Sequence, residues 1–210
     1  MTTLFRFIAL AALFAAVSPA FAADKLSDEQ AKYFASSLHT NHLKQAFDTS
    51  AVLAFGDCKE LNDQGLSVTF SQPLVLKNGA PASGAWKEQH AVAGCGSTKV
   101  LNFYAAPGLD GSPAFTAGMI GTTMADINLQ RTAVQYAFLA ATQKNVCANY
   151  EAVDTHLDQG PGGPDTKQVW YETWAVRGCG HTYDVPLLFT REGANTSLTA
   201  DIKGVREHAP

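Results

Sequence analysis

Two stretches decide the fold of this chain, WKEQHAVAGCGST at residues 86–98 and WYETWAVRGCGHT at residues 170–182. They align without a gap, and Trp, Glu, Ala, Val, Gly, Cys, Gly and Thr occupy the same positions in both. A second pair of segments, 115–121 and 198–204, repeats further along the chain in nearly the same register. Agreement at two separate places indicates an internal duplication, so the sequence predicts two tandem homologous units.

The duplication sets the expected domain boundaries. We place a signal peptide at 1–22, a first repeat unit at 23–124, a second repeat unit at 125–206 and a disordered tail at 207–210. Each unit then contains one early and one late cysteine.

Helix signals come first in both units. Ser27 and Gln30 have the spacing of a capping box, and helical apolar spacing follows from Ala31. In the second unit, Asp126 or Asn128 can cap a helix that runs to about residue 143.

Strand signals follow the helices. Alternating patterns predict strands at 66–76, 85–93, 99–104 and 114–120, and again at 150–157, 168–177, 182–191 and 197–203. Residues 78–84 are expected to form a turn and residues 158–165 a loop. The predicted fold class is α+β, in which each unit has one or two helices followed by a four-stranded antiparallel sheet, by analogy with cystatin-like proteins.

The first 22 residues have the character of a secretory signal. Arg6 precedes an apolar run at 8–17, and the sequence Ala20-Phe21-Ala22 fits a cleavage site after Ala22. We therefore expect a periplasmic or secreted protein without stable membrane insertion after cleavage.

Composition narrows the expected partners. The chain has 15 Lys and Arg residues against 19 Asp and Glu, a formal net charge of −4, and no run of basic residues. This balance argues against nucleic acid as a partner. The expected partner is an unidentified protein or small-molecule ligand in the periplasm or outside the cell, and no cofactor is expected.

Four cysteines in an exported chain most often form two disulfides. An ancestral unit with two cysteines would have paired them internally, so duplication favours Cys58–Cys95 and Cys147–Cys179. A zinc site is disfavoured because the chain has no Cys-x-x-Cys pair.

The candidate ligand-binding residues lie on one face of the two matched strands. Alternation places them together as Trp86, Glu88 and His90 in the first unit and Trp170, Glu172 and Trp174 in the second. A carboxylate among apolar neighbours must be paired or hydrogen-bonded. One interpretation is a half-covered face whose glutamate is satisfied at its rim, and the other is a pocket in which Trp and Glu grip a ligand.

Other candidate chemistry is weaker. His39 and His42 could share a metal, but no third ligand is placed, so we interpret them as two exposed histidines and predict no metal site. A catalytic Glu88–His90 pair is disfavoured because Trp174 replaces the histidine in the second unit.

One motif resembles a set of uncharacterised exported bacterial proteins, which share a Trp-x-Val-x-x-Cys-Gly strand and turn. The residues that carry the resemblance are WAVRGCG at 174–180 and the strand VPLLF at 185–189. The first unit keeps residues 92–96 of this motif but has His90 in place of the tryptophan. The resemblance implies a bacterial periplasmic location and no known activity.

These observations give a leading hypothesis and two alternatives. The leading hypothesis is a non-enzymatic binding or interaction module. The first alternative is a hydrolase-type enzyme that uses Glu88 with His90, or Glu172 alone. The second is a structural or stress accessory protein of the cell envelope.

Overall fold

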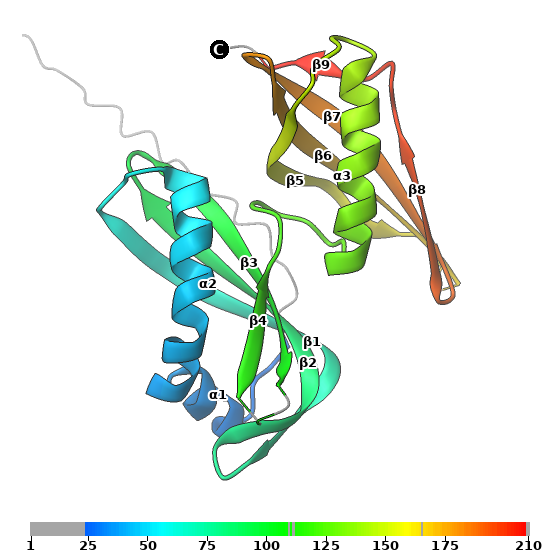
Figure 1. The fold of residues 1–210 in the computed structure, drawn as a ribbon. Helices are drawn as coiled ribbons and strands as arrows, with labels where there is room; N and C mark the ends of the chain where they lie inside the picture. Colours follow the sequence, from blue (N-terminus) through cyan, green and yellow to red (C-terminus); the bar gives the residue numbers. More distant parts are fainter. Residues whose placement is uncertain (1–23, 109, 111, 165, 209–210) are drawn as a thin grey trace, which may run out of the picture.

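The structure is a computed structural model that describes residues 24–108, 110, 112–164 and 166–208. It is an α+β protein with two antiparallel sheets (Figure 1). The predicted signal peptide at 1–22 lies outside the described residues. No helix among the described residues combines the length and the apolar character that crossing a membrane requires.

The first unit begins with two helices and continues as a four-stranded sheet in the order β1-β2-β3-β4. Its elements are α1 (Asp28–Phe34), α2 (Ser37–Phe55), β1 (Leu61–Lys77), β2 (Ala80–Gly94), β3 (Ser97–Pro107) and β4 (Pro113–Ala117). All neighbouring strands are antiparallel.

The second unit has one helix and a five-stranded sheet, one strand more than predicted, with the main strand order β5-β6-β7-β8. Its elements are α3 (Ile127–Thr142), β5 (Tyr150–Gly162), β6 (Lys167–Gly178), β7 (His181–Glu192), β8 (Asn195–Ala200) and β9 (Arg206–Glu207). The short strand β9 pairs with β7.

The helices begin where the sequence predicts them. Ser27 and Gln30 form both hydrogen bonds of the capping box at α1. The side chain of Asp126 accepts from two backbone amides at the start of α3, so Asp126 is the cap and Asn128 is not. Ser36 caps α2 in the same way.

Three expected boundaries differ in the structure. The turn after β1 is only Asn78-Gly79, because both residues have positive φ (54° and 77°) and make a tight hairpin turn. Strand β5 continues through Gly162 into the segment that was expected to be a loop, with Gly162 opposite Val169. Glu207, assigned to a disordered tail, pairs with Tyr183 because β7 extends beyond the end of β8.

Each long helix covers one face of its own sheet. In Figure 1, α2 (cyan) and α3 (yellow-green) cross their sheets in similar ways. Alanines of α3 pack against Trp170, Trp174 and Phe189 on the second sheet. In the first unit, Leu43 of α2 packs in a cluster with Leu101 and Phe103 of β3.

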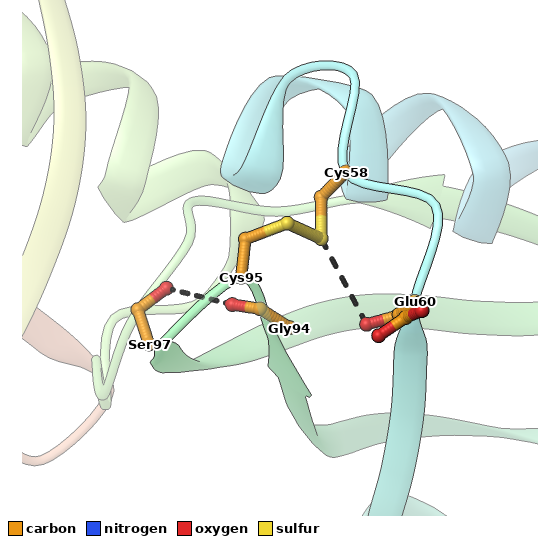
Figure 2. Close-up of a disulfide and its surroundings, with 5 residues drawn as sticks. All are labelled: Cys58, Glu60, Gly94, Cys95 and Ser97. Carbon is orange, nitrogen blue, oxygen red and sulfur yellow. Dashed lines mark hydrogen bonds between the residues drawn. A yellow bond between two sulfur atoms is a disulfide. The ribbon is translucent and has the colours of Figure 1, made fainter.

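Both predicted disulfides are present and occupy the same place in the two units. Cys58–Cys95 and Cys147–Cys179 each join the segment after a helix to a hairpin turn of the sheet (Figure 2 shows the first). Cys95 and Gly96 have φ values of 46° and 80°, and Cys179 and Gly180 have values of 51° and 82°. These positive angles are those of a tight hairpin turn, so the matched Gly-Cys-Gly sequence shapes the turn as well as anchoring it.

The segment between the units hydrogen-bonds to both sheets. Gly121 donates its amide to Val100 of β3 (2.8 Å) and forms a bridge with Thr155 of β5. The side chain of Asn102 donates to the carbonyl oxygen of Gly121 (2.7 Å). Lys99 of the first unit forms an ion pair with Asp154 of the second.

Candidate functional site

Two buried carboxylates lie at matching positions of the two units. Glu88 on β2 and Glu172 on β6 are both 0 % exposed. The indole Nε1 of Trp86 donates to Glu88 (2.7 Å), and that of Trp170 donates to Glu172 (3.0 Å). Alternation along a strand brings residues two apart to the same face, so the Trp-x-Glu sequence builds this pair in both units.

Glu172 is held by groups that carry no charge. Besides Trp170, it accepts hydrogen bonds from Trp174 Nε1 (2.9 Å), the hydroxyl of Thr123 (2.8 Å) and the amide of Met124 (2.8 Å). These four donors satisfy both oxygens of the buried carboxylate. In the second unit the glutamate therefore has a structural role.

Glu88 is held by two histidines in addition to Trp86. His39 Nε2 donates to both carboxylate oxygens (2.9 and 3.0 Å), and His90 Nε2 lies 3.2 Å from Oε2. His39 is 2 % exposed and His90 is 5 % exposed. The first unit thus has ionisable partners where the second has an indole, a hydroxyl and an amide.

His90 continues the hydrogen-bond chain to the protein surface. Its Nδ1 lies 2.8 Å from Oδ2 of Asp63, whose side chain is 45 % exposed. Both ring nitrogens of His90 face carboxylate oxygens, and only the imidazolium ion can donate from both. The chain Asp63–His90–Glu88–His39 therefore links solvent to the core of the first unit.

The pKa values of Glu88 and His90, two members of this hydrogen-bond chain, are shifted in opposite directions. Burial would raise the pKa of Glu88, but hydrogen bonds from His39 and His90 together with Trp86 outweigh it and hold the pKa below its ordinary 4.5. Burial would lower the pKa of His90, but its hydrogen bonds to Glu88 and Asp63 outweigh it and raise the pKa above 6.5. Both shifts favour the ion pair over its neutral form.

One nitrogen in this chain has no partner. Nδ1 of His39 is buried and makes no hydrogen bond among the described residues. Because Nε2 donates to Glu88, the neutral ring presents Nδ1 as an acceptor.

A groove lies between α2 and β1 beside this chain, and we name it the α2–β1 groove. Its volume is about 440 Å³, within the range of small-molecule sites. Both apolar and polar side chains line it. The lining residues are Phe34, His39, Thr40, Asn41, Leu43, Lys44, Phe47, Asp48, Asp63, Leu66 and His90.

The structure places all six predicted binding residues in the interior. Exposure is 5 % at His90 and at most 1 % at Trp86, Glu88, Trp170, Glu172 and Trp174. Neither the half-covered face nor the pocket in which Trp and Glu grip a ligand matches this burial, because the helices cover the face. Of the six, only His90 lines a groove.

The sequence did not predict two members of this hydrogen-bond chain, His39 and Asp63. His39 was interpreted as exposed together with His42, which is wrong for His39 because its ring turns into the core to meet Glu88. Asp63 lies in a polar stretch that shows no strand alternation. The sequence did carry one signal. Ser36 is a helix-capping residue three positions before His39, which places this histidine in the first turn of a helix.

Among the described residues, no group of three or more His, Cys, Asp or Glu side chains is arranged to hold a metal ion. Comparison of the chain with protein-family models, with curated proteins and with solved structures gave no match. The function must therefore be argued from the geometry alone.

Proposed function

We propose that this protein is an exported, disulfide-stabilised binding module whose ligand site is the α2–β1 groove of the first unit. The observation that carries the proposal is the difference between His90 and Trp174. Each follows the matched glutamate by two residues on the same face of the strand. The groove lies beside His90, the smaller of the two side chains.

The two side chains play the same hydrogen-bonding part and differ in size. Trp174 Nε1 donates to Glu172, as His90 Nε2 does to Glu88. The indole of Trp174 is 0 % exposed and packs in the core of the second unit. An imidazole in that place is smaller and has a second nitrogen, which reaches Asp63 at the surface. This combination supports an accessible site in the first unit.

The geometry favours binding over hydrolysis by Glu88. A general acid or base must lie within hydrogen-bond reach of its substrate. Glu88 is 0 % exposed, and its two oxygens already accept from three side chains. Glu172 is enclosed in the same way. Neither carboxylate has a path to a substrate in this arrangement.

Export is the part of the proposal that the disulfides support. Disulfides persist in oxidising compartments such as the periplasm, and all four cysteines are paired. The proposal places cleavage after Ala22 and membership in the exported bacterial group that the Trp-x-Val-x-x-Cys-Gly motif resembles. Mass measurement of the secreted chain tests the cleavage, since a mature protein beginning elsewhere than Ala23 would refute it.

The proposal also includes duplication of one ancestral unit. The matched Trp–Glu hydrogen bond, the repeated order of helix and antiparallel strands, and the disulfide at the same turn support it. After duplication, one unit kept a closed core and the other acquired the groove.

A fragment screen tests the proposed function. Compounds are added to the isotope-labelled mature protein, and amide chemical shifts are followed by NMR. The proposal expects hits whose shifts cluster at Leu43, Phe47 and Leu66 around the groove. A screen in which all hits cluster elsewhere, or in which none is found, would refute this assignment of the site.

A further inference from the structure

We infer that the α2–β1 groove takes a small organic amine, a molecule with an apolar body and a protonated amino group that hydrogen-bonds to Asp63. The inference rests on the proposed function and adds the chemical class of the ligand. It follows from which hydrogen-bonding groups at the groove are occupied and which are available.

The cationic side chains at the charged end of the groove are already paired with carboxylates. His90 directs Nε2 to Glu88 and Nδ1 to Asp63, so its ring has no nitrogen available for an anionic ligand. The ammonium group of Lys44 is paired with Asp48 at 2.6 Å. Lys44 keeps further N–H donors beyond this pair, but Asp48 balances its charge, so a ligand carboxylate or phosphate gains no net positive charge from the pair.

Acceptor capacity remains at the same place. Asp63 accepts from His90 through Oδ2 and from the amide of Gly65 through Oδ1 (3.1 Å). A carboxylate offers about four acceptor sites, so Asp63 can accept further hydrogen bonds. His39 also lines the groove, but its unpartnered Nδ1 is buried, so Asp63 is the acceptor that a ligand can reach. The available chemistry is that of a site for donors.

The charge of the chain favours a cation. Asp63 and Glu88 both pair with His90, and of these two carboxylates Asp63 is the one that lines the groove. A protonated amine near Asp63 therefore gains electrostatic energy, and an anion loses it. Complementarity of this kind gives a site its selectivity.

The apolar wall accounts for the rest of the ligand. Phe34, Leu43, Phe47 and Leu66 line the groove, and Leu66 remains 38 % exposed. The ring of Phe47 packs edge-on to His90 at 5.7 Å between centroids, so the apolar wall adjoins the charged end. An alkyl or aryl body placed on this wall buries apolar surface.

An extended peptide is a poorer fit than a small molecule. A peptide that adds to a sheet edge needs regular backbone groups on that edge. The register of β1 shifts between Asp63 and Gly65, and such a bulge interrupts the backbone pattern beside the groove. A volume of about 440 Å³ suits one small ligand.

Three probes with one apolar body test the inference. Phenylbutylamine, phenylbutanol and phenylbutyrate are titrated at neutral pH and followed by NMR shifts at Phe47 and Leu66. The amine should bind about tenfold more tightly than the alcohol, the gain expected from a hydrogen bond to a charged group. Phenylbutyrate should bind most weakly, and raising the ionic strength should reduce the preference for the amine.

Two matched variants locate the charge that is responsible. Asp63→Asn should remove the preference for the amine while leaving the alcohol unaffected. Asp48→Asn, which changes an acidic residue of the same groove already paired with Lys44, should leave the preference in place. The ratio of amine to alcohol affinity is read within each variant, so a change in overall stability does not obscure it.

Several results would overturn the inference. Equal or tighter binding of the alcohol or the acid overturns the amine assignment but leaves the groove a binding site. If Asp63→Asn and Asp48→Asn reduce the preference for the amine equally, the preference comes from the overall negative charge of the groove and not from a bond to Asp63. If a lysine-rich peptide binds more tightly than phenylbutylamine, the ligand of the groove is a peptide and not a small amine. If none of the three probes binds but other fragments bind in the groove, the assignment of an amine ligand is refuted and the groove remains the proposed binding site.

Discussion

At the scale of single residues, the two units differ in how they satisfy the same buried glutamate. Glu172 is surrounded by uncharged donors, whereas Glu88 interacts with two histidines. Taking a carboxylate out of water is costly, and its partners must compensate. In the first unit this compensation depends on the protonation of His90, which hydrogen-bonds directly to the carboxylate.

Replacing the first glutamate should destabilise the protein. Glu88→Gln replaces one of the two carboxylate oxygens with an amide group and removes the negative charge that His39 and Trp86 bond to. We therefore expect a loss of about 2 kcal/mol in the free energy of unfolding. Urea denaturation followed by tryptophan fluorescence measures it. Glu172→Gln is the matched control and should cost a similar amount. A neutral effect of Glu88→Gln would contradict the burial and bonding described for this carboxylate.

The contribution of His90 to stability should fall at alkaline pH. Its folded pKa is raised above 6.5, so its stabilisation is complete below about pH 6.5 and is lost as the pH rises through the folded value. The pKa of Glu88 is lowered below 4.5, so its contribution is complete above about pH 4.5 and is lost as the pH falls through the folded value. Both contributions are therefore present together between these two values.

Comparison with a variant measures this dependence. The difference in unfolding free energy between the wild type and His90→Gln should be largest near pH 6 and should shrink towards pH 9. The corresponding difference for Glu172→Gln should stay level up to about pH 7, because the direct partners of Glu172 are indoles, a hydroxyl and an amide. It should change only near pH 8, where Lys87, which Glu172 attracts, titrates. A difference for His90→Gln that grows with pH would contradict the sign of the shift.

At the scale of elements, each disulfide joins the end of a helix to a hairpin turn. Cys58 follows α2 and bonds to Cys95 in the turn between β2 and β3, where Ser97 also donates to the carbonyl oxygen of Gly94 (Figure 2). The bond closes a loop of sequence separation 37, and that of the second unit a loop of separation 32. Helix and sheet are thus tied together in both units.

Removing one disulfide should destabilise its own unit. Loop-closure entropy for these separations corresponds to about 4 kcal/mol, so Cys58→Ser with Cys95→Ser should lower the unfolding free energy by about that amount. Hydrogen exchange of β2 and β3 should rise, while exchange of β6 and β7 stays near the wild-type value. Equal loss of protection in both sheets would show that the units do not respond separately.

The elements also show what the sequence can and cannot predict. The caps at Ser27 and Asp126 and the cysteine pairing depend on local spacing or on the repeat, and the structure confirms them. The length of β1 was underestimated because Asn62, Asp63 and Gln64 near its start are polar and the register shifts between Asp63 and Gly65. The partners of Glu88 could not be predicted, since His39 is 49 residues away and only the packing of α2 on the sheet brings it there.

At the scale of the whole molecule, a buried polar junction connects the two units. Lys87 on β2 donates to the carbonyl oxygen of Thr123 (2.6 Å), and Thr123 in turn donates to Glu172. Burial lowers the pKa of Lys87 to about 8, against the opposing attraction of Glu172. Thr123, at the end of the first unit, therefore links Lys87 of the first sheet to Glu172 of the second.

Gly121 is the position where this junction is most sensitive. Its φ is 101°, and a Cβ there would collide with the backbone of Thr155. We expect Gly121→Ala to cost more than about 2 kcal/mol, whereas Gly96→Ala, with φ of 80° and open space around it, should cost only about 1 kcal/mol. Chemical denaturation measures both, and equal costs would contradict the close approach of the units at Gly121.

The central claim, that His90 in place of a tryptophan opens a binding site, is tested most directly by His90→Trp. This variant gives the first unit the side chain that the second unit has, with an indole that can donate to Glu88 as Trp174 does to Glu172. Thermal unfolding confirms that the variant is folded, and NMR titration with the fragments that bind the wild type is then repeated. We expect binding at the α2–β1 groove to be lost, and undiminished binding at Phe47 and Leu66 in the folded variant would contradict the claim.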